Sequence, residues 1–259
     1  MASSVANGSS DHFQYSLQMN LRIAICFFGL TRSLHYTLKS IVSNIYEVLR
    51  ENHIHYDVFL HTYNLKNITN PRSGEYKVKL NASEFYSLNP TYYHVSDQET
   101  FLQTINLNEY LVRGDAWNDG NNSAKNLLCQ YNSINFVTEM WLTKHHENPY
   151  DLVMYLRPDL SYNKLNVSNL YYAYQNKSLL LPNYHQFGGY NDRFAVGIPS
   201  LMEKYGKRMK YLKTYCETHL LHGESFMKYL LSPLNPEELF DLKGKRIRAN
   251  GKIRDEELF

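Results

Sequence analysis

The run LRIAICFFG, residues 21–29, determines how the rest of the chain is interpreted. It is almost continuously apolar and ends in glycine, which is typical of a strand that is buried on both faces. The next apolar residues recur at helical spacing from Leu34 to Leu49. A second buried strand, YDVFLHTY, follows at residues 56–63. Strand, helix and strand within about forty residues predict a βαβ unit, so the sheet begins with parallel strands.

The rest of the sequence continues this alternation of strands and helices. Residues 1–20 are small and polar, and we expect a flexible lead-in. Strands are expected at 89–95, 150–156, 178–182 and 193–197, a short strand or lid at 245–251, a loop at 113–123, and helices at 96–105, 123–146, 199–221 and 222–231. We therefore predict one α/β domain over residues 21–259, with a mixed, mainly parallel sheet flanked by helices. Its cleft should lie at the carboxyl ends of the parallel strands.

The composition limits the kinds of partner. With 20% charged residues and a net charge of +2, the chain gives no electrostatic reason to expect nucleic acid or an anionic membrane. No signal peptide and no apolar run of membrane-spanning length occur, so we expect a cytoplasmic protein without a membrane span. The 23 tyrosines suit a cleft for sugars, although biased composition explains them equally well. Cys26, Cys129 and Cys216 have neither disulfide nor zinc-site spacing, which favours a reducing compartment.

Several common enzyme motifs are absent from the sequence. It contains no GxxxxGK[ST] loop, no GxGxxG after the first strand, and neither GxSxG nor HExxH. These absences argue against P-loop phosphoryl transfer, an ordinary dinucleotide-binding fold, serine hydrolases of the GxSxG type and HExxH zinc proteases. The remaining candidates for chemistry lie at the ends of the predicted strands.

The first strand runs into Gly29, Leu30, Thr31 and Arg32. Glycine allows a ligand to approach the backbone, and the hydroxyl and the first helical amides can bind phosphate or ribose. The guanidinium of Arg32 can neutralise a diphosphate. The alternative is an ordinary tight turn followed by a solvated arginine.

The stretch YDLVMYLRPDL, residues 150–160, is a buried strand with a charged end. Pro158 has no amide proton and cannot continue a central ladder, so the strand must stop there. Asp159 then lies at the edge of the cleft, where a carboxylate beside a diphosphate is a natural ligand for Mg²⁺ or Mn²⁺. The alternative is a surface ion pair between Arg157 and Asp159 that closes a turn.

The order and spacing of several segments resemble the GT-A type glycosyltransferases, especially the small capsid-glycan glycosyltransferases of large algal DNA viruses. These segments are AICFFGLTR, YDLVMYLRPDL, LPNYHQFGGYNDRFAVG, HGESFMKYLL and KRIRANG. The resemblance implies a nucleotide-binding half at about 21–160 and an acceptor-side half at about 161–259. It also implies that Asp159 holds the metal, whereas Arg157 replaces the first carboxylate of the usual Asp-x-Asp motif. If the chain is viral, its compartment is the host cytoplasm.

The resemblance also implies roles for single residues. Gly29, Leu30, Thr31 and Arg32 would hold the nucleotide, with Thr62 and Tyr63 near the base or ribose. Asn126, Gln130, Arg157 and Arg248 would contact the donor, with Arg246 and Arg248 as a basic lid. His185, Gly188 and Gly189 would lie under the transferred sugar and acceptor. The alternatives are a polar helix face for the two amides and a solvated basic strand for the lid.

Glu224 and Asp192 are the candidates for the catalytic base. The resemblance places Glu224 at a helix N-terminus, where we expect the helix dipole to depress its pKa and keep it ionised. Asp192 would orient a sugar hydroxyl or act as the base instead. His222 is a candidate metal ligand or phosphate contact, although a surface histidine is the alternative.

The resemblance implies a metal-assisted hexosyltransferase that uses Mn²⁺ or Mg²⁺. It would move a sugar from a nucleoside-diphosphate donor, UDP-linked by family habit, to a glycan acceptor, with inversion. Two further hypotheses remain: a nucleotide-sugar or glycan-binding module without turnover, and a nucleotidyltransferase. The oligomeric state, the sugar and the acceptor are left open.

Overall fold

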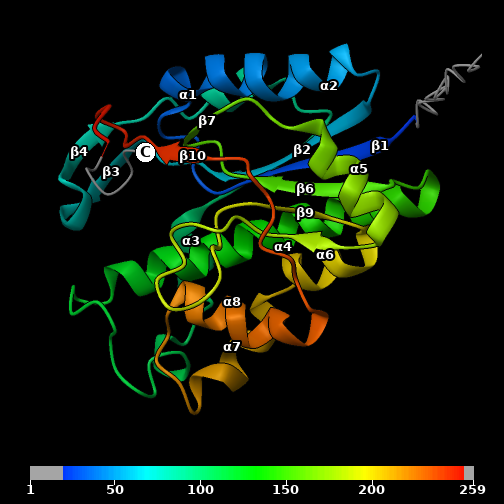
Figure 1. Cartoon of the computed structure of the whole chain (residues 1–259). Coiled ribbons are helices and arrows are strands. Elements are labelled where there is room, and N and C mark those ends of the chain that lie inside the picture. Colours follow the sequence, from blue (N-terminus) through cyan, green and yellow to red (C-terminus); the bar gives the residue numbers. More distant parts are fainter. Residues whose placement is uncertain (1–19, 254–259) are drawn as a thin grey trace, which may run out of the picture.

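The buried run at 21–29 forms strand β1, Arg22–Phe28, in the middle of the central sheet of this computed structural model, which describes residues 20–253 (Figure 1). The predicted lead-in, apart from Asn20, lies outside that range. The side chains of β1 alternate between two apolar clusters: Ile23, Ile25 and Phe27 join one, and Ala24, Cys26 and Phe28 join the other. Burial on both faces explains the continuous apolar sequence.

The central sheet has the order β5-β2-β1-β6-β9-β8. Its parallel part comprises β5 (Tyr92–Ser96), β2 (His55–Tyr63), β1 and β6 (Leu152–Leu156). Strand β9 (Ala195–Gly197) pairs antiparallel with β6, and β8 (Leu179–Leu180) pairs antiparallel with β9. The predicted mixed, mainly parallel sheet is confirmed.

Helices cover both faces of the sheet (Figure 1). One apolar cluster includes residues of α1 (Leu34–Ile41), the π-helical turn Val42–Tyr46, α2 (Glu47–Glu51) and α5 (Val167–Asn176). The other includes residues of the long α4 (Asn122–Glu147), α6 (Pro199–Gly206), α7 (Met209–Cys216) and α8 (Gly223–Leu231). The short α3 (Gln98–Gln103) contacts α4. The predicted α/β architecture is therefore a helix–sheet–helix sandwich.

Within residues 20–253, two small antiparallel pairs of strands lie outside the central sheet. Strand β7 (Leu160–Tyr162) pairs with β10 (Gly244–Arg246), which brings the predicted short strand near residue 245 beside the end of β6. Strands β3 (Asn67–Asn70) and β4 (Glu75–Lys79) form a hairpin that the sequence did not predict.

The prediction of one continuous helix over 199–221 is wrong. The chain leaves helical geometry between α6 and α7, and Arg208 at this break is fully buried. Its guanidinium lies 3.9 Å from the ring centre of Tyr205 and 5.3 Å from that of Tyr131. Gly206 is packed so tightly that a Cβ would lie 2.0 Å from Thr138 Oγ1. Close packing against α4 therefore decides where α6 ends.

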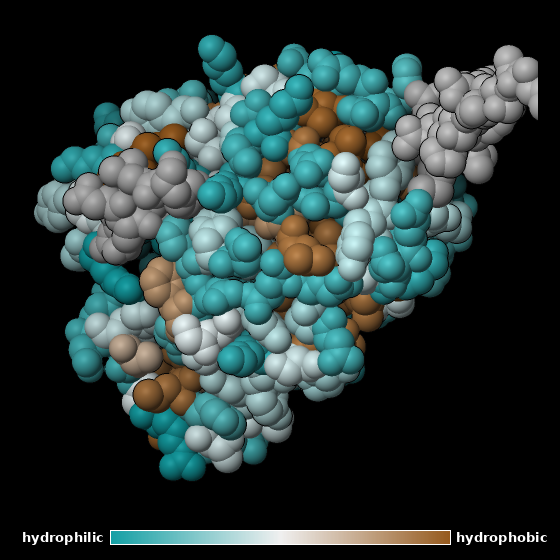
Figure 2. Space-filling model, viewed as in Figure 1, coloured by the Kyte–Doolittle hydropathy of each residue, from teal (hydrophilic) through white to brown (hydrophobic). Residues whose placement is uncertain are grey.

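The face shown in Figure 2 is mainly hydrophilic, with apolar side chains in scattered patches, an ordinary pattern for a globular protein. Cys26, Cys129 and Cys216 are buried free thiols, in agreement with the absence of a disulfide framework. Within residues 20–253, no helix has the length and hydropathy needed to cross a membrane.

Candidate functional site

A cavity of about 390 Å³ lies where the parallel strands β1 and β6 end. Gly29, just beyond β1, and Arg157, just beyond β6, both line it. Helix α4 contributes Asn126 and Gln130, which are one helical turn apart. The β3–β4 hairpin, the loop before β9, the N-terminus of α8, and β10 with the segment after it also contribute to the lining. The predicted cleft position at the carboxyl ends of the strands agrees with this geometry.

The lining of this cavity is strongly basic. Among the described residues, six arginines line it, namely Arg32, Arg72, Arg157, Arg193, Arg246 and Arg248. The same lining contains two carboxylates, Asp192 and Glu224. Guanidinium groups bind phosphate oxygens through planar, bidentate hydrogen bonds. The side-chain set therefore suits a ligand with several negative charges at one end.

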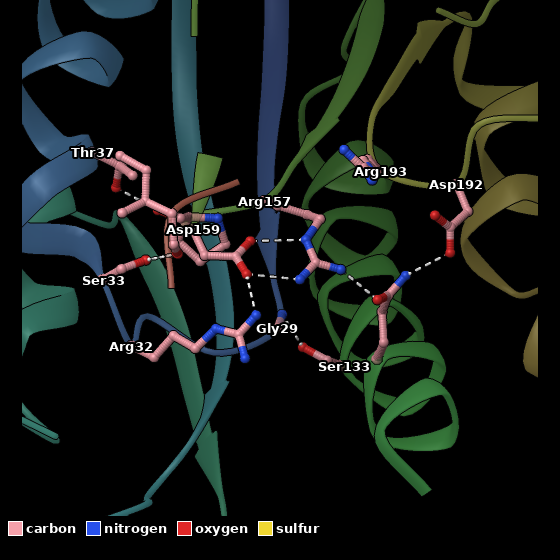
Figure 3. A network of polar contacts seen from close by, with 12 residues as sticks. Gly29, Arg32, Ser33, Thr37, Ser133, Arg157, Asp159, Asp192 and Arg193 are labelled. Carbon is pink, nitrogen blue, oxygen red and sulfur yellow. Dashed lines mark hydrogen bonds and ion pairs between the residues drawn. The ribbon is translucent and has the colours of Figure 1, made fainter. Parts of the chain in front are cut away.

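Asp159 lies behind this basic lining and is buried (Figure 3). Its Oδ1 accepts a hydrogen bond from Arg157 Nε, and its Oδ2 accepts one from Arg157 Nη2, both at 2.9 Å. Oδ2 also accepts from Arg32 Nη2 at 2.9 Å. Burial alone would raise the pKa of Asp159, but Arg157 and Arg32 outweigh it and hold the pKa well below its usual range. Asp159 is therefore an ionised anchor for two arginines that face the cavity.

Several of the cationic groups lie close enough to repel one another. Burial lowers the pKa of Arg246 well below its ordinary value, and the charges of Arg193, Arg248 and Arg157 lower it further. Asp159 partly offsets these effects on the pKa of Arg246. An anionic ligand in the cavity would reduce this repulsion.

Glu75 on β4 contacts Arg32, near the start of the described chain, and Ala249, near its end. It is buried, and its Oε2 lies 3.5 Å from Arg32 Nη1. Its Oε1 accepts a hydrogen bond from the amide of Ala249 at 2.8 Å. Nearby, Ser33 Oγ donates to the carbonyl oxygen of Ile247 at 2.8 Å. These contacts fix the segment after β10 against the turn after β1.

The turn after β1 has the conformation that its glycine predicts. Gly29 has a φ of 92°, and no atom lies within 4 Å of the position that its Cβ would occupy. Its amide donates to Ser133 Oγ on α4 at 2.8 Å. Leu30 lines the cavity as well. Thr31 is buried and does not line the cavity, and its carbonyl oxygen accepts the amide of Leu34.

Thr62 and Tyr63, both predicted to lie near a base or ribose, are on opposite faces of β2. Side chains alternate along β2, so Thr62 shares a face with Leu60, whose side chain packs in the cluster that includes α1 and α2. Tyr63 does line the cavity. Its hydroxyl donates to the carbonyl oxygen of Cys129 and accepts from Asn132 Nδ2, both at 2.9 Å. These two hydrogen bonds to α4 fix the position of Tyr63 in the lining of the cavity.

Gln130 links Arg157, one of the arginines that line the cavity, to the carboxylate of Asp192. Arg157 Nη1 donates to Gln130 Oε1. Gln130 Nε2 in turn donates to Asp192 Oδ2 at 3.0 Å. Figure 3 shows this series of contacts from Asp159 through Arg157 to Asp192. Gln130 and, one turn earlier, Asn126, both predicted to contact the donor, line the cavity.

Glu224 and Asp192 form an acidic pair at the start of α8. A Cβ placed on Gly223 would lie 3.1 Å from Asp192 Oδ2, which shows how closely Asp192 approaches the residue before Glu224. Burial raises the pKa of Glu224 from its ordinary value of 4.5 to about 7, and the charge of Asp192 adds to this rise. The prediction that the helix N-terminus would depress this pKa is therefore wrong. Desolvation and the second carboxylate outweigh the helix dipole.

His222 supports α8 and Glu224. Its Nδ1 caps the helix by accepting the amide of Ser225, and its Nε2 lies 3.5 Å from Glu224 Oε2. Because Nδ1 accepts, the neutral ring carries its proton on Nε2, where it faces the carboxylate. Trp117 stacks on the imidazole with ring centres 6.3 Å apart. Burial lowers the pKa of His222, which favours this neutral form.

The loop before β9 packs directly on the first turn of α8. Gly189 lies so close that a Cβ would be 1.8 Å from the carbonyl oxygen of Glu224. The next amide, of Tyr190, donates to the same oxygen at 2.9 Å. Glycine at position 189 is therefore required for the loop to approach the first turn of α8 this closely.

The predicted sugar contacts from His185, Gly188 and Gly189 are not supported by this arrangement. None of the three lines the cavity, whereas Phe187 does. His185 Nδ1 lies 3.1 Å from Arg193 Nη1, and Gly188 has a φ of 83° in an open turn. From this loop, Phe187 and Asp192 reach the cavity.

Among the described lining residues that had not been selected from the sequence, four have aromatic or cationic side chains: Arg72, Trp117, Phe187 and Arg193. A turn signal, NPRSG at 70–74, marks the hairpin that carries Arg72. Trp117 lies in the predicted loop 113–123, where the Asp115 carboxylate accepts three backbone amides. Arg193 directly follows a candidate residue. Each of these residues lies near a local sequence signal, but only the fold brings them to the same cavity.

The residues predicted to hold a divalent metal do not fit that role in this arrangement. Both oxygens of Asp159 are hydrogen-bonded to arginines, and Nδ1 of His222 caps α8. Asp159 does not line the cavity, whereas His222 does. Within residues 20–253, no group of three or more His, Cys, Asp or Glu side chains is arranged to hold a metal ion.

Comparisons with known proteins give a likeness of fold. The sequence matches no protein family and no curated relative. The structure is similar to mouse xyloside xylosyltransferase 1 in its apo form, with a TM-score of 0.39, 11% identity, and coverage of 84% of this chain and 83% of that chain. It is also similar to the apo form of the glycosyltransferase GlyE of Streptococcus pneumoniae TIGR4, with a TM-score of 0.39 and 14% identity. That match covers 83% of this chain and 44% of GlyE, so the chain spans less than half of GlyE. At these values the likeness concerns the fold and assigns no activity.

Proposed function

We propose that this protein is a glycosyltransferase that moves a sugar from a nucleoside-diphosphate donor to a hydroxyl group of a glycan acceptor. One observation carries the proposal: a single cavity combines six arginines with an acidic pair, Asp192 and Glu224. The arginines suit the diphosphate of the donor. The carboxylates suit the sugar and the hydroxyl that attacks it. Gln130 links the two groups through Arg157 and Asp192.

The reaction needs a base and a stabilised leaving group. In an inverting transfer, the acceptor oxygen forms a bond to the anomeric carbon while the bond from that carbon to the diphosphate oxygen breaks. The acceptor proton passes to the Glu224 carboxylate, whose pKa of about 7 suits proton transfer near neutral pH. The leaving diphosphate retains the electron pair of the broken bond, and the guanidinium groups stabilise its charge.

Asp192 has a supporting role in this proposal. It raises the pKa of Glu224 by its charge, and it is positioned by the hydrogen bond from Gln130. An ionised carboxylate beside the sugar can also accept a hydrogen bond from a ring hydroxyl. The proposal therefore assigns proton transfer to Glu224 and orientation of the sugar to Asp192.

The test is a panel of nucleotide-sugars incubated with the protein and a set of glycan acceptors, with and without Mn²⁺. We expect release of a nucleoside diphosphate together with addition of one sugar to one acceptor, read by mass spectrometry. Glu224→Gln should retain donor binding and lose transfer by at least about a hundredfold, the usual scale for a general base. Glu51→Gln, at an exposed site on α2, is the matched control and should keep full activity.

Two other outcomes would overturn the proposal. Release of pyrophosphate would identify a nucleotidyltransferase, and saturable donor binding without any product would identify a binding module. Retained transfer by Glu224→Gln would move the base to Asp192 without changing the class of reaction.

A further inference from the structure

We infer that arginines of this chain, held in place by Asp159, neutralise the departing diphosphate and take the part that a divalent metal ion would otherwise have. This inference rests on the proposed function. It assigns Asp159 as a positioning residue for Arg157 and Arg32 and gives it no contact with a metal.

The first argument is the geometry of Asp159. Three hydrogen bonds of 2.9 Å occupy its two oxygens, two from Arg157 and one from Arg32. The side chain is 1% exposed and does not line the cavity, whereas both arginines do. The carboxylate is thus behind the cationic groups, and a ligand in the cavity meets guanidinium groups first.

The second argument is the charge around this position. A metal ion bound to Asp159 would have to displace charge-assisted hydrogen bonds from two arginines and then lie beside both of them. The charges of Arg193, Arg248 and Arg157 already act on the half-buried Arg246 close to Asp159. Another two positive charges at this place would be repelled, whereas a diphosphate would be attracted.

The third argument is the rigidity of the arginines. Arg157 is fixed by Asp159 on one side and by Gln130 on the other. Arg32 is fixed between Asp159 and Glu75. Donors that are already oriented need little rearrangement as charge develops on the diphosphate oxygen during bond cleavage. The arginines donate hydrogen bonds and transfer no proton in this step, and the electron pair of the broken bond stays on the diphosphate.

The test measures binding of UDP by calorimetry, first to protein dialysed against EDTA and then with Mn²⁺ added. We expect saturable binding without metal, with less than about a threefold change in affinity when Mn²⁺ is present. Sugar transfer should likewise continue in EDTA. Binding and transfer that require Mn²⁺ would overturn the inference and leave the proposed function intact. Absence of binding under both conditions by UDP, and likewise by GDP, CDP and ADP, would instead overturn the proposed function.

Asp159→Asn separates the two roles by its effect on the response to Mn²⁺. If Asp159 is a metal ligand, Mn²⁺ strengthens UDP binding to the natural chain and no longer does so in the variant. If Asp159 orients the arginines, the UDP affinity of each protein is the same within about threefold in EDTA and in Mn²⁺, and the variant has a lower melting temperature. A gain in affinity from Mn²⁺ that Asp159→Asn abolishes would contradict the inference.

Arg248→Gln provides a second variant if Asp159→Asn fails to fold. Arg248 lines the cavity, and its loss should weaken metal-free UDP binding at least about tenfold. Lys39→Gln removes one positive charge from an exposed position on α1 and should leave the affinity unchanged. Equal affinities for the two variants would show that the arginine wall does not bind the diphosphate.

Discussion

Glu224 is a carboxylic acid in surroundings that favour its neutral form. Burial and the charge of Asp192 raise its pKa to about 7, although it lies in the first turn of α8. His222 approaches it from one side, and the Gly189 loop packs against its backbone. A carboxylate that is costly to ionise in the folded protein accepts a proton readily, so its environment affects both reactivity and stability.

The pH dependence of transfer should therefore report on Glu224. We expect kcat/KM to rise with pH through a midpoint near 7 as the carboxylate becomes ionised. In Asp192→Asn the repelling charge is gone, so the midpoint should move to lower pH even if the overall rate falls. The measurement is a pH profile of kcat/KM for both proteins, and an unchanged midpoint would show that Asp192 does not influence the base.

The stability of the fold should also depend on the ionisation of Glu224, but in the opposite direction. Ionisation favours transfer and disfavours folding. The pKa of Glu224 is higher in the folded protein than its ordinary value, so its contribution to stability is complete below pH 4.5 and is lost as the pH rises through about 7. Glu224→Gln should thus be more stable than the natural chain at pH 8, by up to about 3 kcal/mol at 1.36 kcal/mol per pKa unit. Urea unfolding at pH 5 and pH 8 measures this difference. A variant that is equally destabilised at both values would contradict the assignment.

At the scale of elements, the site depends on how closely the loop before β9 approaches α8. Gly189 has no room for a side chain, and the amide after it donates to the Glu224 carbonyl oxygen. Helix α4 holds the other side, because Ser133 Oγ accepts the Gly29 amide and also lies 2.8 Å from His61 Nδ1. The loop, α8 and α4 thus set the width of the cavity.

Gly189→Ala should be far more damaging than Gly188→Ala. The added methyl would lie 1.8 Å from the Glu224 carbonyl oxygen, so the loop or α8 must move and transfer should fall at least about tenfold. At Gly188 no atom lies within 4 Å, and the cost is the left-handed conformation alone, about 1–2 kcal/mol. Activity and urea unfolding of the two variants provide the comparison. Similar activity in both would show that the loop is not closely coupled to the catalytic group.

At the scale of the whole molecule, the cavity collects side chains from distant parts of the sequence. Arg32 follows β1, Arg157 follows β6, and Arg246 and Arg248 belong to β10 and the segment after it. The fold therefore concentrates positive charge in one place although the whole chain has a net charge of only +2. A ligand that neutralises this place should stabilise the entire fold.

Inorganic pyrophosphate alone should raise the melting temperature of the protein. At a hundredfold excess over its dissociation constant, the expected stabilisation is about 2.7 kcal/mol. This corresponds to a shift of roughly 5–10 °C for a chain of this size. The shift should decrease with added salt because of screening, and monovalent acetate at equal ionic strength is the control. Equal shifts with pyrophosphate and acetate would contradict a specific polyanion site.

The sequence predicted the parts of the fold that have strong local signals. The buried strands β1, β2 and β6 were predicted because burial on both faces leaves continuous apolar runs. The end of β6 at Leu156, shortly before Pro158, followed from the missing amide proton of the proline. These strands also predicted the edge of the sheet where the cavity lies.

Other features depend on contacts between distant residues and had no local signal. The pairing of Asp159 with Arg32 joins residues 127 positions apart, so a predicted metal ligand is an ion-pair partner in the structure. The raised pKa of Glu224 depends on burial and on Asp192 in another loop. The break between α6 and α7 depends on burial of Arg208 against aromatic rings. Helical periodicity carries no information about any of these contacts.

The contacts of Glu75 have a consequence for the order of events during protein synthesis. Its carboxylate joins Arg32 to the amide of Ala249, and Ser33 Oγ bonds to the carbonyl oxygen of Ile247. A nascent chain can form β1, β2 and α4 long before the ribosome reaches Arg248. The arginines that line the cavity, however, come together only when the residues after β10 dock on Arg32, Ser33 and Glu75. This docking step joins residues that are far apart in the sequence and therefore has high contact order. The proposed donor site is therefore completed last, after the central sheet has formed.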